Sequence, residues 1–180
     1  MEGRSPVDKR ALPLIILGGA DCVWDDADRA LEFQPATTIA INDMVARWAR
    51  PIDHAVSLHP DKLQRWVQER RRRGLPGEFT TWCHKDGWTD RHTRDWGGSS
   101  GLLAVKIARE LGHTRIILCG IPMDAEAAHF FDAKPWKPAN RYRAAWITRK
   151  QEISPFVRSM SGWTKGLLGP PDEVWLSQAP

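Results

Sequence analysis

The chain has 180 residues, a length typical of one domain that buries about 70% of its unfolded surface. Its formal net charge is +4 and its pI is about 9.2, which permits an anionic partner without requiring one. The three cysteines, Cys22, Cys83 and Cys119, lie far apart with no Cys-x-x-Cys pair, which argues against a disulfide framework or a structural zinc site.

Residues 1–11 read as a polar leader, and residues 12–180 are expected to form a single α/β nucleotide-binding domain. The sequence contains no signal peptide and no apolar run near the ~20 residues that a membrane span needs. We therefore expect a cytoplasmic protein without a membrane partner. The sequence does not indicate an oligomeric state.

Apolar runs alternate with amphipathic stretches through the first half of the chain. Strands are predicted at Leu12–Leu17, Thr38–Ile41, Asp53–Leu58 and Glu78–Cys83. Helices are predicted over Val23–Leu31, from Met44 to Trp48 and from Pro60 to Arg73. The third helix begins with a proline and an acid and ends with four arginines, the order that the helix dipole favours. A polar loop, His84–Trp96, follows the fourth strand.

The stretch from Gly97 to Asp124 predicts one helix and one buried strand. Ser99 or Ser100 can cap the helix, because a serine hydroxyl accepts a hydrogen bond from a backbone N–H of the first turn. Gly112 stands where a left-handed residue ends a helix. The unbroken apolar run Ile116–Cys119 is typical of a strand covered on both faces.

After Gly120 the pattern weakens. We expect a loop over Ala133–Asn140, a partly helical segment over Arg141–Met160, and a short helix and an edge strand within Leu167–Leu176. The alternation predicts an α/β, Rossmann-like fold: a mostly parallel sheet of about five to six strands with helices on both faces. The first strand and the Arg115–Cys119 strand should be central neighbours.

Ligands of such sheets bind outside the carboxyl ends of the strands. Polar residues and glycines gather at those predicted ends and at one helix start: Gly18, Gly19, Asp21, Asn42, Asp43, His59, His84, Ser99, Ser100, Gly101, Gly120 and Asp124. Glycines let a ligand approach the backbone, and a helix N-terminus offers N–H groups to an anion. The sequence therefore predicts one crevice that holds a nucleotide.

Four short segments carry a resemblance to known families. The stretch GSSGLLAVKIARELGHTRIILCGIPMD resembles the Thr-Ser-Gly helix and the Ser-Gly-Ile-Asp strand end of the bacterial sialyltransferases of glycosyltransferase family 42. It is equally similar to the related 6-hydroxymethylpterin pyrophosphokinase-like proteins. The early LIILGGADCVWDD stands where those families carry a Gly-x-Gly-Pro-Ser loop, and IAINDM and AHFFDA resemble their Asn-terminated strand and their Tyr-Ala-Phe-Asp segment. The match runs in order over roughly Leu12–Asp132.

The resemblance implies nucleotide contacts, in the sialyltransferases to the CMP of CMP-sialic acid. The residues so implied are Gly18, Gly19, Asn42, Ser100 and Gly101. Three features of this chain depart from the family pattern. Asp21-Cys22 replaces Pro-Ser in the first loop, Tyr142 is the only tyrosine, and the family's catalytic histidine falls further along than His129. The resemblance therefore supports nucleotide binding by this chain better than it supports sialyl transfer.

Structural alternatives stand beside several of these readings. Gly18-Gly19 could be only a tight turn, Asn42-Asp43 only a helix cap, and His59 only a strand-end residue. The Arg70–Arg73 run could be a solvated helix end, or could grip the phosphates of a nucleic acid through Arg70, Arg71, Arg72 and Arg73. Among the ten tryptophans, Trp82, Trp88 and Trp96 border the predicted crevice, where one could stack on a base.

Two functions from different classes follow. In the first, the protein is a transferase that uses a nucleotide-activated donor, a nucleotide sugar or a nucleoside triphosphate. A histidine, His129 or His59, takes the acceptor proton, Asp124 is a further catalytic candidate, and Mg²⁺ can enter with a diphosphate. In the second, the domain binds a nucleotide or a nucleic acid without chemistry. No tightly bound cofactor and no structural metal are expected.

Overall fold

A computed structural model of the chain describes Arg10 and residues 12–130 and 133–178. Its strands are β1 (Leu14–Leu17), β2 (Thr37–Ile41), β3 (His54–Val56), β4 (Thr80–Cys83), β5 (Arg91–His92), β6 (Ile116–Cys119) and β7 (Val157–Ser159). Its helices are α1 (Val23–Leu31), α2 (Met44–Arg47), α3 (Pro60–Arg72), α4 (Ser100–Glu110), α5 (Ala139–Ile153), α6 (Gly162–Leu168) and α7 (Glu173–Ser177). The predicted polar leader lies almost wholly outside the described residues.

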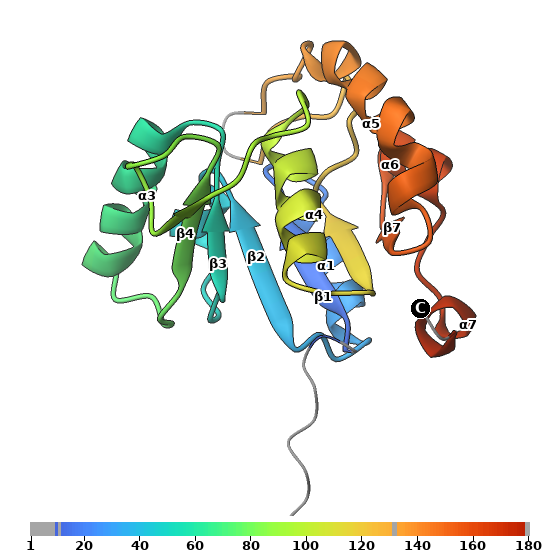
Figure 1. Cartoon of the computed structure of the whole chain (residues 1–180), viewed down its shortest axis with the longest axis horizontal. Helices are drawn as coiled ribbons and strands as arrows, with labels where there is room; N and C mark the ends of the chain where they lie inside the picture. Colours follow the sequence, from blue (N-terminus) through green and yellow to red (C-terminus); the bar gives the residue numbers. More distant parts are fainter. Residues whose placement is uncertain (1–9, 11, 131–132, 179–180) are drawn as a thin grey trace, which may run out of the picture.

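The strands form one seven-stranded sheet in the order β5-β4-β3-β2-β1-β6-β7, and each neighbouring pair is parallel (Figure 1). This confirms the predicted α/β class and the central pairing of β1 with β6, in register from Leu14–Ile116 to Leu17–Cys119. The sheet has more strands than the five to six expected. No helix in the described ranges is both long and apolar enough to cross a membrane.

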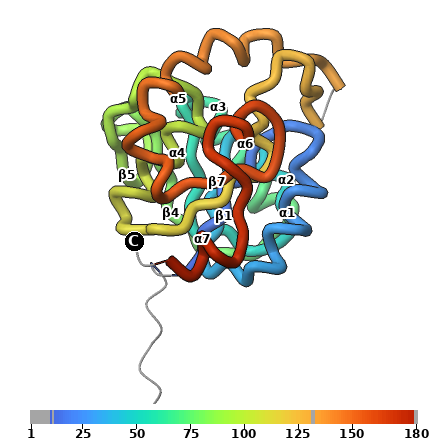
Figure 2. Tube along the Cα trace, turned by 90° about the vertical axis from the view of Figure 1, so that its right-hand side faces the viewer, coloured from blue at the N-terminus to red at the C-terminus, as the bar shows by residue number. Residues whose placement is uncertain are grey.

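Alternate residues of the strands point to opposite faces of the sheet, and each face carries its own core. Leu14 and Ile16 of β1 belong to the cluster that contains α4, whereas Ile15 and Leu17 belong to the cluster that contains α1. Figure 2 shows the strands between α4 and α5 on one side and α1 and α2 on the other. Helices on both faces explain why β1 and β6 are apolar at every position.

The C-terminal part differs from its prediction. Val157–Ser159, within a segment expected to be partly helical, is β7 and pairs with β6. The edge strand expected within Leu167–Leu176 is wrong, because that range holds the end of α6 and most of α7. Asp172 caps α7 by accepting a hydrogen bond from Trp175 N at 2.7 Å, and the buried Trp175 indole donates to Pro155 O. A cap and one buried tryptophan thus favour a helix there.

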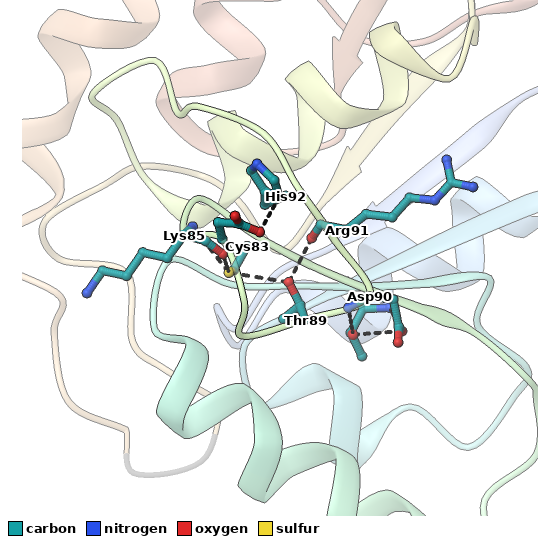
Figure 3. A network of polar contacts seen from close by, with 8 residues as sticks. Cys83, Lys85, Thr89, Asp90, Arg91 and His92 are labelled. Carbon is teal, nitrogen blue, oxygen red and sulfur yellow. Dashed lines mark hydrogen bonds and ion pairs between the residues drawn. The ribbon is translucent and has the colours of Figure 1, made fainter.

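The short strand β5 lies in the predicted polar loop, and polar contacts connect it to β4 (Figure 3). Thr89 Oγ1 donates to the carbonyl of Arg91 at 2.7 Å and lies 3.3 Å from Cys83 Sγ. Asp90 Oδ2 accepts hydrogen bonds from the backbone N–H and the hydroxyl of Thr81, both at 2.8 Å. Because β5 is exposed and has two residues, hydrophobic periodicity could not reveal it.

The end of α3 is not the uniformly solvated arginine run that was expected. Arg70 is fully buried, and its guanidinium donates to the carbonyl oxygens of Val45, Trp48, Arg50 and Pro76. Burial lowers the pKa of this guanidinium. Arg70 therefore anchors α3 to the segment after α2 and cannot grip a nucleic-acid phosphate, so that part of the prediction is wrong. Arg71, Arg72 and Arg73 are exposed.

Candidate functional site

A pocket of about 370 Å³ opens at the carboxyl ends of β1, β2 and β6. Strands β2 to β5 lie on one side of β1, and β6 and β7 lie on its other side. The strand order thus reverses between β1 and β6, and ligands bind at such a reversal in open α/β sheets. Eleven of the residues named in advance line this pocket, whereas Asp21 and His84, also predicted at strand ends, do not: the eleven are Gly18, Gly19, Asn42, Asp43, His59, Ser99, Ser100, Gly101, Gly120, Asp124 and His129. The structure thus brings together residues spread over more than 110 positions of the chain.

Backbone N–H groups of the turn after β1 donate hydrogen bonds to backbone carbonyls of neighbouring segments. The N–H groups of Gly18 and Ala20 donate to the carbonyls of Cys119 and Gly120, and Asp21 N donates to Ala128 O. A Cβ atom on Gly18 would lie 2.4 Å from Gly120 O. The carboxyl ends of β1 and β6 approach so closely that position 18 requires glycine. The three N–H groups already have backbone acceptors, so they cannot donate to a ligand.

His129 and Asp43 form a pair beside Gly19. Nε2 of His129 lies 3.3 Å from Oδ2 of Asp43, and the imidazole stacks on Phe130 with ring centres 4.8 Å apart. A Cβ atom on Gly19 would lie 2.6 Å from that Nε2, so this glycine makes room for the pair. Burial raises the pKa of Asp43, and the nearby His129 opposes that rise. A carboxylate that orients an imidazole is the arrangement of a general base.

Hydrogen bonds tie the ends of β2 and β3 together. Asn42 has a left-handed backbone (φ 53°), and its Oδ1 accepts a hydrogen bond from the Ser57 hydroxyl at 2.8 Å. Ser57 Oγ in turn accepts from His59 N at 2.9 Å. Neither Asn42 nor Asp43 caps α2 through a side chain, because the N-cap residue, Asp43, makes no such bond. Asp43 thus occupies the N-cap position that the cap alternative gave it, but without a side-chain capping bond.

Two helices begin at the wall of the pocket. At the start of α4, Ser99 Oγ accepts from Leu102 N and caps the helix, while Ser100 Oγ accepts from Leu58 N at 3.1 Å. The start of α3 follows His59, an exposed residue whose side chain makes no capping bond. Lys62, in the first turn of α3, also lines the pocket. Two helix N-termini and a lysine therefore lie on this side of the pocket, and Asp61 also stands in the first turn of α3.

Asp124 has structural partners for both carboxylate oxygens. Oδ1 accepts from Arg143 of α5 at 2.9 Å, and Oδ2 accepts from Trp163 N at the start of α6 at 3.1 Å. These bonds fix both helices to the loop after β6. The structure shows a positioning role for Asp124, and its catalytic role stays a prediction.

Among the pocket residues that sequence reasoning missed, four have a cationic or aromatic side chain: Lys62, Trp66, Trp136 and Tyr142. Lys62 and Trp66 are one helical turn apart on a helix that starts at a strand end, a signal that could have revealed them. The aromatic residues proposed to stack on a base, Trp82, Trp88 and Trp96, are not among those that line the pocket.

Each of the three excluded tryptophans has another environment. The indole N–H of the buried Trp82 donates to Nδ1 of His54 at 3.3 Å. Trp96 lies beneath the cations of Lys106 and Arg149, and Trp88 is exposed on the loop before β5.

A wider and more open cavity of about 490 Å³ lies at the opposite edge of the sheet, near the starts of β2, β3 and β4. It lies away from the carboxyl ends, so we assign no site to it. Within the described ranges, no three His, Cys, Asp or Glu side chains come together in a way that could hold a metal ion. Comparisons with protein-family models, with curated proteins and with solved structures found no match to this chain.

Proposed function

We propose that this protein binds a nucleotide in the pocket at the carboxyl ends of β1, β2 and β6 and acts as a transferase on a nucleotide-activated donor. The observation that carries the proposal is the meeting of two helix N-termini, those of α3 and α4, at one pocket wall that also holds Lys62. Unpaired N–H groups and the helix dipole favour a phosphate there.

The phosphate belongs at α4 and not at the turn after β1. In the common Rossmann arrangement the first glycine turn binds the phosphate. Here the N–H groups of Gly18, Ala20 and Asp21 donate to backbone carbonyls, so they are not available to a phosphate. The turn before α4 has Gly97 and Gly98 and places no acid on the pocket wall.

The chemistry follows from the other end of the pocket, where His129 and Asp43 lie. The acceptor hydroxyl oxygen forms a bond to the transferred group as the bond from that group to the nucleotide phosphate breaks. The electron pair leaves with the phosphate, whose charge the N-terminus of α4 stabilises. The proton of the acceptor hydroxyl moves to the imidazole of His129, which Asp43 orients.

A second candidate is a binding module without chemistry. Its support is that Asp124 is fully engaged by Arg143 and Trp163, and that the ring of His129 is held by Asp43 and Phe130. Both functions use the same phosphate subsite, so they differ only in turnover.

A thermal-shift screen tests the proposal with CMP, CDP, UDP, GDP, ATP and CMP-sialic acid, each with and without Mg²⁺. A ligand present at 100 times its dissociation constant stabilises the fold by about 2.7 kcal/mol, a clear rise in Tm. Donor hydrolysis is then assayed for each ligand that binds. Binding with hydrolysis supports the transferase, and binding without hydrolysis supports the module. No shift with any of the six would refute both.

A further inference from the structure

Trp136 and Tyr142 form a stacked pair in the pocket wall. Their ring centres are 5.6 Å apart and the planes differ by 8°. Both residues line the pocket, yet Trp136 retains 40% of its accessible surface. One face of the indole therefore packs on Tyr142, and a large part of this pocket-lining residue remains accessible.

The pair is held by the local backbone. Trp136 N donates to Ala127 O at 3.2 Å, and Ala139 N donates to Trp136 O at 3.0 Å, so the backbone of Trp136 is held on both sides, while the stack on Tyr142 positions the indole. Tyr142 lies on α5 and packs against the core that contains α4. A ring that is already positioned loses little conformational freedom when a ligand stacks on it.

The pair also lies close to the phosphate subsite. A Cβ atom on Gly98, two residues before α4, would lie 3.4 Å from the Cβ of Ala145. Ala145 follows Tyr142 by three residues on α5, so both side chains lie on one face of that helix, one turn apart. Three residues rise about 4.5 Å along a helix, so Tyr142 lies about one turn from the residue that faces Gly98, and Trp136 stacks on Tyr142.

We propose that Trp136, supported by Tyr142, is the stacking platform for the nucleobase of the bound nucleotide. This inference rests on the proposed function, because it takes the phosphate to lie at the start of α4. Stacking on an aromatic ring tolerates every base, since each base has a π face. The platform therefore favours a nucleotide over a sugar phosphate, which has no base. It does not discriminate among bases, which other contacts must do.

Titration calorimetry with AMP, CMP and ribose 5-phosphate tests this assignment on the wild type, Trp136→Ala, Trp136→Phe and the control Trp88→Ala. Base stacking is worth about 1–3 kcal/mol, so Trp136→Ala should weaken AMP and CMP by about 5- to 150-fold. Ribose 5-phosphate has no base, and its affinity should change less than twofold. Trp136→Phe should restore most of the lost affinity, and Trp88→Ala should match the wild type.

Other outcomes separate the two claims. Equal losses for AMP and ribose 5-phosphate in Trp136→Ala, with Trp136→Phe failing to restore AMP, would show that the tryptophan only shapes the pocket and would overturn the platform. Unchanged AMP affinity in Trp136→Ala would overturn it as well, and would assign the ring to the acceptor. A wild type that binds ribose 5-phosphate as tightly as AMP refutes the platform alone. A wild type that binds none of the three refutes the nucleotide site itself, and the platform with it.

Discussion

Two glycine-containing turns face the same pocket, and they use their backbone differently. In the turn after β1, the N–H groups of Gly18, Ala20 and Asp21 donate to carbonyls of the chain, and Gly18 leaves no room for a side chain. The turn Gly97–Ser99 before α4 bends through a left-handed Gly97 with open space where a Cβ would lie, and its Gly98 lines the pocket and packs against Leu102. The first turn packs chain against chain, whereas the second presents a helix start to the pocket.

The comparison teaches that glycine in a strand–helix turn has two physical meanings. It can relieve a steric conflict within the protein, or it can admit a ligand. The first turn also makes room for the proposed base, because Gly19 allows His129 to approach Asp43. We therefore assign chemistry to the β1 side of the pocket and phosphate binding to the α4 side.

Replacing His129 by alanine should have the largest effect on function. If the β1 side carries the chemistry, turnover of the donor should fall by roughly 10²–10⁴ while nucleotide affinity stays within about twofold. Turnover assays with calorimetry on the same samples check both quantities. Loss of nucleotide affinity in this variant would assign His129 to phosphate binding. It would contradict the assignment of chemistry to one turn and phosphate binding to the other.

Replacing Gly18 by alanine should have the largest effect on stability. The new Cβ would lie 2.4 Å from the carbonyl oxygen of Gly120 and 2.5 Å from Ile121, so the ends of β1 and β6 must separate. We expect a loss of about 3 kcal/mol or more in the free energy of unfolding, measured with urea. The control is Gly166→Ala in α6, where the Cβ meets nothing within 4 Å and should stabilise the helix by about 0.5–1 kcal/mol. Equal stabilities of the two variants would refute the steric account of the first turn.

Much of this arrangement could be predicted from the sequence, and the reasons are local. The covered strands β1 and β6 are apolar throughout, α4 has its serine cap and its terminal Gly112 with φ +90°, and strand ends in a parallel sheet must meet at one edge. The apolar strands and the helix ends depend on residues adjacent in the chain, and the meeting of strand ends follows from the parallel topology. They were sufficient to bring the predicted site residues to one pocket.

The misses depend on contacts between distant segments. No local pattern shows that Arg70 is surrounded by four carbonyls, or that Asp124 holds α5 and α6. The strand β7 has three residues, of which Arg158 and Ser159 are polar, so its pairing with β6 decides its conformation. The aromatic wall was sought in Trp82, which instead bonds to His54, and the stack lies at Trp136 and Tyr142.

The smallest predicted effect is a pH dependence at the edge of the sheet opposite to both turns. Burial holds the pKa of His54 below its usual value near 6.5, and its Nδ1 accepts the Trp82 indole N–H. The unfolded chain therefore takes up this proton first as the pH falls, so stability is full above pH 6.5 and declines below it, down to the lowered pKa. Urea unfolding at pH 8 and pH 5 should show a larger loss for the wild type than for His54→Asn. An equal loss would contradict this account of His54, and nucleotide affinity at pH 8 should be the same in both.

The central claim, that the phosphate lies between the starts of α3 and α4, is tested most directly by nucleotide calorimetry on Lys62→Ala beside Arg71→Ala. Both changes remove one exposed cation from α3, the first at the pocket and the second near the far end of the helix. We predict that Lys62→Ala weakens CDP by about tenfold or more, since a hydrogen bond to a charged group is worth about 1.5–3 kcal/mol. Arg71→Ala should bind CDP as the wild type does. Equal affinities in all three proteins, or equal losses in the two variants, would contradict the assignment of the phosphate to this wall.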